Sequence, residues 1–248
     1  MKIAVCVSHV PDTATRISIG SDGKNIDPAG VTYILNPYDE YAVEEALKIK
    51  ESAGGEVVVI SVGGEHNKET LRKALAMGCD NAVLLKDDGY RDSFGIATAL
   101  AAEIKSQGAE LVFLGKQSVD YDNSITGQLT AELLGFSCVS VVVGLKIEGE
   151  KIIAEREIEG GKEVLETKLP AVITAQKGLN EPRYASLKGI MSAKKKVIEE
   201  KPAAAAESSI EIVKLKKPTP KQAGKILGEN SSVVPELVRL LREEAKVI

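Results

Sequence analysis

The sequence has 248 residues, a formal net charge of -4 and 44% hydrophobic residues. This length allows one large or two smaller domains, and the composition is that of a soluble globular protein, which argues against a disordered chain or one that coats nucleic acid. No apolar run approaches the roughly 20 residues that a membrane-spanning helix needs, so we expect neither nucleic-acid binding nor direct membrane insertion.

Cysteine and histidine are both scarce. Cys6, Cys79 and Cys138 are isolated and odd in number, which fits reduced cysteines in a cytosolic protein better than a disulfide or zinc framework. His9 and His66 are the only histidines, so a His-rich metal site is not expected. The apolar N-terminus is too short for a signal peptide and lacks a cleavage-type site. We expect a cytoplasmic protein, or a mitochondrial-matrix protein in a eukaryote.

Strands and helices alternate along the first half of the chain. Lys2 to Val7 is a continuous apolar strand, followed by a polar stretch that suggests a small hairpin around Gly20–Gly23. Asn36-Pro37 then begins a helix that Gly54-Gly55 ends. The same alternation continues with strands at 56–62, 81–85 and 111–114 and helices at 67–77 and 92–107. This rhythm predicts an α/β fold with a doubly wound, mostly parallel, Rossmann-like sheet.

After residue 136 the pattern becomes strand-rich. Strands are expected at 137–143, 151–158, 163–168 and 171–175, with a hairpin at Gly160-Gly161 that adds antiparallel strands. Residues 201–209 read as a linker, 210–215 as a short strand and 235–247 as an amphipathic helix. These predict a nucleotide-binding domain at 1–183, a recognition loop at 184–200 and, at 201–248, a linker and C-terminal arm that packs on another subunit.

One loop is a candidate phosphate site. A short strand ends near Gly115, a polar loop follows, and a helix begins at an expected N-cap, Asp122 or Asn123. Free N–H groups and the macrodipole at a helix start suit a phosphate. The loop matches neither G-x-G-x-x-G nor G-x-x-x-x-G-K-[ST], so an ordinary strand-to-helix connection remains the alternative.

A second candidate lies in LNEPRYASLKGIMSAKKK. Leu187, Ile190 and Met191 stand beside the basic cluster of residues 194–196. A charge run of this kind is usually a solvated helix end. An apolar anchor with a positive rim is also the design of a docking loop for an acidic partner.

Several blocks of sequence together resemble one family. AEREIEGGKEVLETKLPAVIT, NPYDEYAVEEALKIKE, ETLRKALAMGCD, LVFLGKQSVDYDNSITGQLTAELL and LNEPRYASLKGIMSAKKK occur in the order found in the beta (small) subunit of electron transfer flavoprotein. The resemblance covers essentially the whole chain.

The resemblance implies a heterodimer whose alpha subunit holds most of one FAD. Such a carrier takes electrons from flavin dehydrogenases, such as the acyl-CoA dehydrogenases of fatty acid beta-oxidation, and passes them to a quinone oxidoreductase or another acceptor. It also implies a largely structural AMP in the beta subunit. The positions that match the AMP pocket are Cys6, Asn36, Pro37, Tyr38, Asp39, Val62, Gly115, Lys116, Gln117, Ser118, Val119, Asp120, Tyr121, Asp122, Asn123, Ser124, Ile125 and Thr126.

The resemblance assigns further roles to single residues. Tyr38 stands where the family places an aromatic side chain against the FAD of alpha, and Thr13 stands where many relatives have a second, flavin-facing tyrosine. Leu187 matches a leucine that enters a hydrophobic pocket on the dehydrogenase, with Ile190 and Met191 in support.

Three alternatives remain open. A branch of the family binds a second FAD in place of AMP and bifurcates electrons, and it shares VPDT at Val10 to Thr13. Tyr121 and Gln128 depart from that branch's D-G-D-T-A-Q-V-G-P loop. Outside the family, an AMP- or ATP-binding regulatory module and a nucleotide-dependent enzyme using Lys116 fit the fold class. The chain lacks a nucleophile–base pair and metal-ligand spacing, which favours a carrier over an enzyme.

Overall fold

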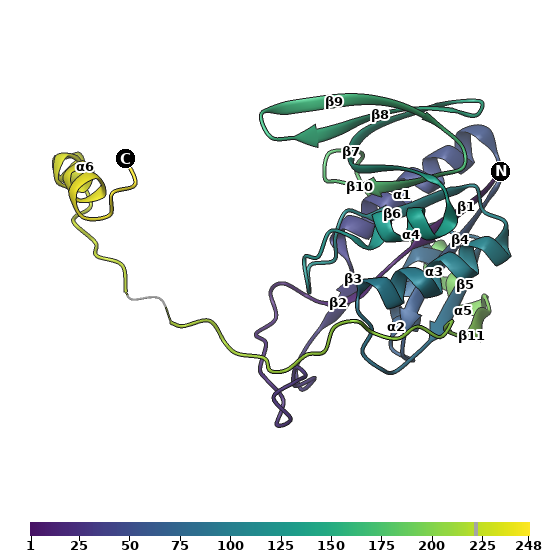
Figure 1. Cartoon of the computed structure of the whole chain (residues 1–248), viewed down its shortest axis with the longest axis horizontal. Helices are drawn as coiled ribbons and strands as arrows, with labels where there is room; N and C mark the ends of the chain where they lie inside the picture. Colours follow the sequence, from purple (N-terminus) through teal and green to yellow (C-terminus); the bar gives the residue numbers. More distant parts are fainter. Residues whose placement is uncertain (221–222) are drawn as a thin grey trace.

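The computed structural model describes residues 1–220 and 223–248. Among these residues, one large sheet contains β1 (Lys2–Cys6), β4 (Glu56–Gly63), β5 (Asn81–Lys86), β6 (Leu111–Gly115), β7 (Ser137–Glu148), β8 (Lys151–Ile158), β9 (Gly161–Lys168), β10 (Ala171–Ala175) and β11 (Ile198–Pro202). The strand order is β11-β5-β4-β1-β6-β10-β7-β8-β9 (Figure 1). All neighbours from β11 to β7 are parallel, and β7, β8 and β9 pair antiparallel. The predicted mostly parallel sheet with added antiparallel strands is confirmed.

Helices cover both faces of the sheet. They are α1 (Pro37–Ala53), α2 (Asn67–Met77), α3 (Ser93–Gln107), α4 (Thr126–Leu134), α5 (Leu187–Lys195) and, near the C-terminus, α6 (Val234–Glu243). In β1, Ile3 and Val5 belong to the core that includes α1 and α2, whereas Ala4 and Cys6 belong to the core that includes α3 and α4. Successive side chains of a strand point to opposite faces, so a doubly wound sheet buries every residue of its central strand.

Most element boundaries follow from local chemistry. Pro37 is the first residue of α1, where its missing N–H costs nothing, and Gly54 ends that helix. The Asp92 side chain caps α3 by accepting the N–H of Gly95 at 2.8 Å, and Gly108 ends it in the left-handed conformation. The predicted hairpin around Gly20–Gly23 contains a single bridge, between Ile19 and Ile26.

The later strands enter the sheet out of sequence order. β10 lies between β6 and β7, so the chain passes over one position, builds the β8–β9 hairpin and then returns. β7 is longer than predicted and contains an irregularity, where Val141 has a φ of 61° and its N–H bonds to Thr174 Oγ1 at 3.0 Å. A second pair of strands, β2 (His9–Pro11) and β3 (Tyr33–Leu35), forms a small separate ladder.

The segment after residue 183 differs most from the sequence prediction. The expected recognition loop contains α5, and β11 then joins the sheet edge beside β5, so the expected boundary between residues 200 and 201 falls inside a strand. The expected linker is partly held, because Arg91 Nη1 donates to the Ala204 carbonyl at 2.8 Å and Asp92 Oδ2 accepts the Ser209 N–H at 2.7 Å. The strand predicted at 210–215 is wrong, because no sheet edge lies beside that segment to complete its hydrogen bonds.

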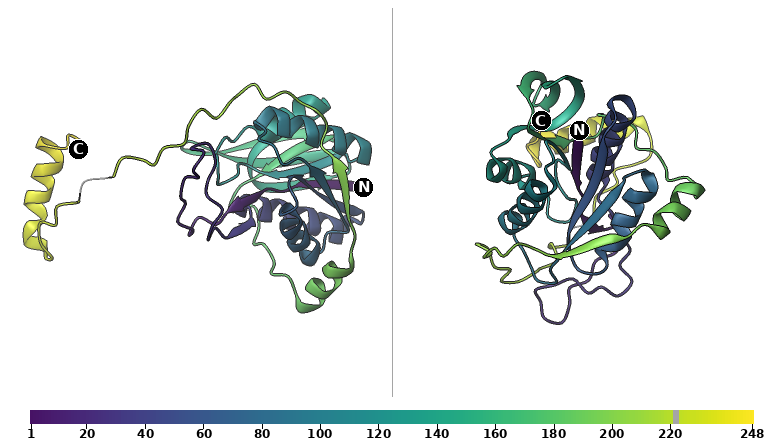
Figure 2. Two further views of the ribbon diagram at one scale, coloured as in Figure 1. Left: turned by 90° about the horizontal axis from the view of Figure 1, so that it is seen from below. Right: turned by 90° about the vertical axis from the view of Figure 1, so that its right-hand side faces the viewer.

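The C-terminal arm ends in a short 3-10 turn, η1 (Ser231–Val233), and α6. Figures 1 and 2 show α6 well apart from the α/β body, on the far side of an extended stretch. Its apolar side chains, including Leu237 and Val238, are exposed. Within the described residues, no helix combines the length and the apolar character needed to cross a membrane.

Candidate functional site

A cavity of about 220 Å³ lies where β1, β4 and β6 end. β1 is followed in sequence by β4 on one side of it, and β6 lies on its other side, so the order of the sheet reverses here. At such a switch point the loops that follow two neighbouring strands separate and leave a crevice in which ligands bind.

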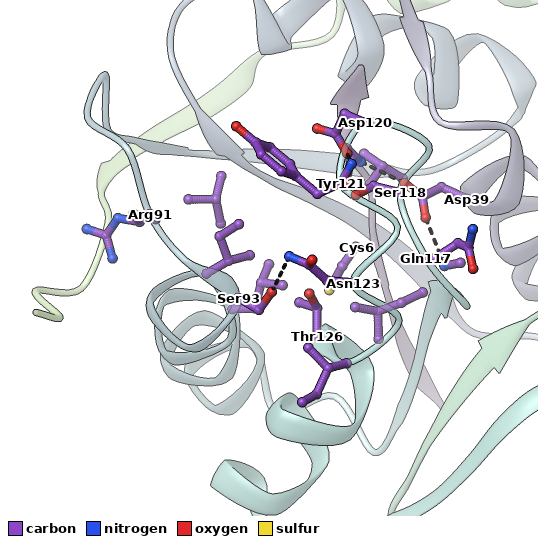
Figure 3. Close-up of a pocket in the computed structure, with 18 of the residues that line it drawn as sticks. Cys6, Asp39, Arg91, Ser93, Gln117, Ser118, Asp120, Tyr121, Asn123 and Thr126 are labelled. Atoms are coloured by element: carbon purple, nitrogen blue, oxygen red, sulfur yellow. Dashed lines mark hydrogen bonds between the residues drawn. The ribbon is translucent and has the colours of Figure 1, made fainter. Parts of the chain in front are cut away.

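Most of the residues predicted for a nucleotide pocket line this cavity (Figure 3). They are Cys6, Asp39, Val62, Gly115, Lys116, Gln117, Ser118, Asp120, Tyr121, Asn123, Ser124, Ile125 and Thr126. Five predicted residues are not in the lining: Asn36, Pro37, Tyr38, Val119 and Asp122. The cavity therefore brings together side chains from β1, α1, β4 and the β6–α4 loop.

The β6–α4 loop turns sharply before its helix begins. Asp122 and Ser124 have φ angles of 53° and 52°, which non-glycine residues rarely adopt. The prediction that Asp122 or Asn123 caps the helix is wrong: α4 begins at Thr126, its N-cap is Ile125, and no side chain caps it. The reason is that Asp122 Oδ1 instead accepts the side-chain amide of Gln117 at 2.5 Å, which holds Asp122 inside the loop. Backbone strain of this kind is common at ligand sites.

The start of α4 presents unpaired backbone donors. Among residues 1–220 and 223–248, no acceptor from the chain lies within hydrogen-bonding distance of the N–H groups of residues 123–128. A left-handed residue followed by one with negative φ, as at Ser124 and Ile125, is the geometry of anion-binding backbone concavities. This helix start can therefore hold a phosphate by its N–H groups and its dipole.

Asn36 holds the loop from below. Its side chain is fully buried, and its Nδ2 donates to the Gln117 carbonyl at 2.9 Å. Its Oδ1 accepts the N–H of Val119 at 3.2 Å. Asn36 thus fixes the loop without lining the cavity.

Asp39 joins two strand ends across the cavity floor. Its Oδ2 accepts the N–H of Ser8 at 2.7 Å, and its Oδ1 accepts the N–H of Gly115 at 2.8 Å. Burial raises the pKa of Asp39 from 3.8 to about 7, although both N–H groups favour the charged form. Burial, followed by the nearby Asp39 charge, also raises the pKa of the Cys6 thiol. The thiol therefore stays protonated and serves as apolar lining.

Gly115 lets β6 approach α1 closely. A Cβ at this position would lie 2.5 Å from Asp39 Oδ1 and 2.7 Å from the Tyr38 carbonyl carbon. The prediction that a glycine permits close approach at the strand end is confirmed, and the approaching group is the backbone of α1.

Tyr38 and Thr13 lie outside the cavity. The Lys116 ammonium lies over the Tyr38 ring, 5.2 Å from its centre, so Lys116 is engaged in a cation–π contact. Tyr38 is half-buried, and Thr13 lies on an exposed turn after β2. Both side chains are at the surface of the chain.

The opposite wall of the cavity was not predicted from the sequence. Tyr90, Arg91 and Ser93, which follow β5, line it. Asn123 Nδ2 donates to Ser93 Oγ at 3.1 Å and so links the two walls (Figure 3). The signal that could have found them is positional, because loops that follow parallel strands meet at one edge of the sheet.

Leu187, Ile190 and Met191 form an exposed surface on α5. Leu187 is 83%, Met191 61% and Ile190 40% exposed. This segment is a helix, with Ser186 Oγ accepting the N–H of Gly189 at 3.0 Å, where a loop was predicted. We call the three residues the apolar face of α5. Figures 1 and 2 place α5 towards the end of the sheet that carries the N-terminus.

The basic cluster beside this face is divided by the structure. Lys194 and Lys195 are exposed. Lys196 turns inward, and its Nζ donates to the Cys79 carbonyl at 2.7 Å. Metal chemistry has no support in the described part of the chain, where no three His, Cys, Asp or Glu side chains group as metal ligands.

Comparison with known proteins gives consistent similarities. An electron transfer flavoprotein domain matches residues 24–206. The chain is 42% identical to the electron transfer flavoprotein subunit beta of Bacillus subtilis (strain 168) over all of both chains. It is 42% identical to the mitochondrial subunit beta of Oryza sativa subsp. japonica, again over all of both chains. It is 38% identical to the subunit beta of Mus musculus over 96% of each chain.

Proposed function

Since this chain belongs to the electron transfer flavoprotein family, as a beta subunit, we propose that it carries electrons from flavin dehydrogenases, such as acyl-CoA dehydrogenases, to a quinone oxidoreductase or another acceptor. The chain is an electron carrier subunit and not an enzyme, and it acts in a heterodimer with an alpha subunit. The FAD, held mainly by alpha, supplies the redox chemistry, while the protein supplies position and environment.

The nucleotide that we propose for this chain is AMP. The observation that carries this proposal is the row of unpaired backbone N–H groups at 123–128, which faces a closed polar cavity. At about 220 Å³ the cavity is below the roughly 300–1,000 Å³ of common small-molecule pockets, which favours one nucleotide over a dinucleotide. Tyr121 stands in its lining and reduces the space for a second FAD. Ser124, Ile125 and Thr126 would donate their N–H groups to the phosphate.

The nucleotide released from the purified heterodimer tests this proposal. After denaturation and chromatography we expect one AMP and one FAD per heterodimer. Two FAD and no AMP would show the electron-bifurcating alternative to be right. Release of ATP or its turnover by the chain would support a regulatory module or an enzyme instead.

Thr126→Asp should weaken nucleotide retention by about tenfold or more, because it sets a carboxylate against the phosphate. Aspartate in the first turn of a helix is favourable for the helix itself, so α4 should remain folded. The measurement is AMP content by chromatography, together with circular dichroism. The neutral control is Thr126→Asn. Undiminished AMP in the aspartate variant would rule out the phosphate at this helix start.

We propose that the apolar face of α5 docks on the dehydrogenase. Leu187 would be the anchor, Ile190 and Met191 would support it, and the exposed Lys194 and Lys195 would attract an acidic surface. Exposed apolar side chains with a charged rim are the usual design of an interface hot spot.

Leu187→Ala should raise the KM of an acyl-CoA dehydrogenase for the heterodimer by about tenfold, a loss typical of an interface anchor. FAD and AMP content should not change, because α5 does not line the cavity. The check is steady-state electron transfer at varied heterodimer concentration. Val164→Ala, an equally exposed change on β9, is the control. Equal kinetics for the Leu187 variant and the parent chain would reject the anchor role.

Two further assignments complete the proposal. Tyr38 and Thr13, at the surface outside the cavity, would face the FAD held by alpha, with the Lys116 cation next to Tyr38. The arm after β11 would pack on alpha through the exposed apolar side of α6. The protein would act in the cytoplasm, or in the mitochondrial matrix of a eukaryote.

A further inference from the structure

Helix α5 has little of its own to hold it in place. It is nine residues long, only Ala193 in it is buried, and Gly189 lies in its first turns. Isolated helices of this length are marginal in water, and glycine lowers helix propensity further. The orientation of α5 therefore depends on contacts with its neighbours, chiefly α2.

Two cations join α2 and α5 reciprocally, each at the C-terminal end of the other helix. Arg72 on α2 donates from Nη1 to the carbonyl oxygens of Ala193 and Lys196, both at 2.5 Å. Lys196, directly after α5, donates from Nζ to the carbonyl oxygens of Cys79 and Asp80, at 2.7 and 3.0 Å, just beyond α2. The last carbonyls of a helix lack partners within it and form the negative end of its dipole, so a cation there stabilises that end.

Between these two ties the helices touch closely. Gly189 lies against the carbonyl oxygen of Ala76, where a Cβ would clash. Gly189 and Ala193 are four residues apart and so share the inner side of α5. Leu187 and Met191, also four residues apart, are exposed on another side. Whatever fixes the inner side therefore fixes the direction in which the apolar face points.

We infer that Arg72 and Lys196 are positioning residues for docking, which together clamp α5 so that its apolar face is presented ready for a partner. This inference depends on the proposed docking role of α5. Neither residue needs to contact the partner, because each acts through the position of Leu187. Lys196 thereby differs from Lys194 and Lys195, whose exposed charges remain available for steering. A preformed anchor reduces the ordering cost of association.

The test uses the heterodimer with an acyl-CoA dehydrogenase. Arg72→Met should raise the KM for the heterodimer by about tenfold while kcat, FAD content and AMP content stay unchanged, because association is affected and the redox centre is not. Lys196→Met should raise the KM by about threefold, and it also serves as the second variant should Arg72→Met fold poorly. Arg72→Lys, which keeps a donor and the charge, should restore part of the loss.

Lys73→Met is the matched control. It removes the same charge from the neighbouring position of α2, but Lys73 pairs with Glu40 and not with α5. Its KM should equal that of the parent chain. An increase equal to that of Arg72→Met would assign the effect to net charge and overturn the clamp.

Two measurements separate the clamp from the docking role itself. In a Leu187→Ala background, Arg72→Met should raise the KM little further, because both changes act on one face. Should Leu187→Ala alone leave KM unchanged, the docking role fails; should it raise KM while Arg72→Met does not, or should the two effects multiply, only the clamp fails. Amide hydrogen exchange should be faster in α5 of the Arg72→Met heterodimer, and unchanged exchange would overturn the clamp directly.

Discussion

Gly115→Ala should lower the free energy of unfolding by about 3 to 5 kcal/mol, the sum of an overpacking cost and a weakened hydrogen bond to a buried carboxylate. The new methyl group would meet Asp39 Oδ1 and the backbone of Tyr38 at 2.5 to 2.7 Å. β6 would have to move away from α1 and lengthen the bond between the Gly115 N–H and Asp39. The measurement is thermal unfolding of the heterodimer at fixed concentration, where we expect Tm to fall by about 10 °C.

Gly161→Ala is the control for this change. It adds the same methyl group at the start of β9, where no heavy atom lies within 4 Å, so Tm should stay within about 1 °C. A Tm for Gly115→Ala that also stays within this limit would mean that β6 does not approach α1 as closely as the structure has it. Loss of AMP should accompany the loss of stability, because Gly115 lines the cavity.

Asp39→Asn should abolish a pH dependence of stability. The folded state raises the pKa of Asp39 from 3.8 to about 7, so between these values the folded chain binds a proton that the unfolded chain does not. The stability associated with this proton is present below the unfolded pKa and is lost as pH rises through the folded pKa. The slope is at most about 1.4 kcal/mol per pH unit, which amounts to about 2 to 3 kcal/mol between pH 5 and pH 7.

The measurement is chemical denaturation of parent and variant across this range. The Asp39→Asn chain should lack the decline, although its amide NH₂ faces a backbone donor and costs about 1 to 3 kcal/mol at every pH. Asp22→Asn is the control, because Asp22 is exposed and its hydrogen bonds lower its pKa, which confines its pH dependence to more acidic conditions. Parallel curves for the parent and the Asp39 variant would contradict a raised pKa at this site.

The residues that the sequence placed well are those whose role is local. Pro37 begins α1, Gly108 ends α3, and the continuous apolar run of β1 is buried on both faces, as predicted. Each of these outcomes depends on neighbours within a few residues or on the average environment of a parallel sheet. Gly115 was likewise identified from its place at a strand end.

The errors occurred where distant residues compete with local preference. Asp122 has the chemistry of an N-cap, but the side chain of Gln117 binds it first and the helix begins later. Residues 198–202 look like a polar connection, yet they become β11 because the edge of β5 is open to them. The segment 210–215 has strand-like residues and no such edge.

The sequence by itself determined the alternation of strands and helices, the family, and the loop that opens α4, since these depend on periodicity, short motifs and order along the chain. Only the tertiary structure decided how that loop is held, because Asn36 reaches it across 81 residues and Asp39 reaches Gly115 across 76. It alone also placed Arg72 and Lys196 at each other's helix ends, 124 residues apart. Hydrogen bonds between such distant groups form only when the packed sheet brings them together, and no local pattern records them.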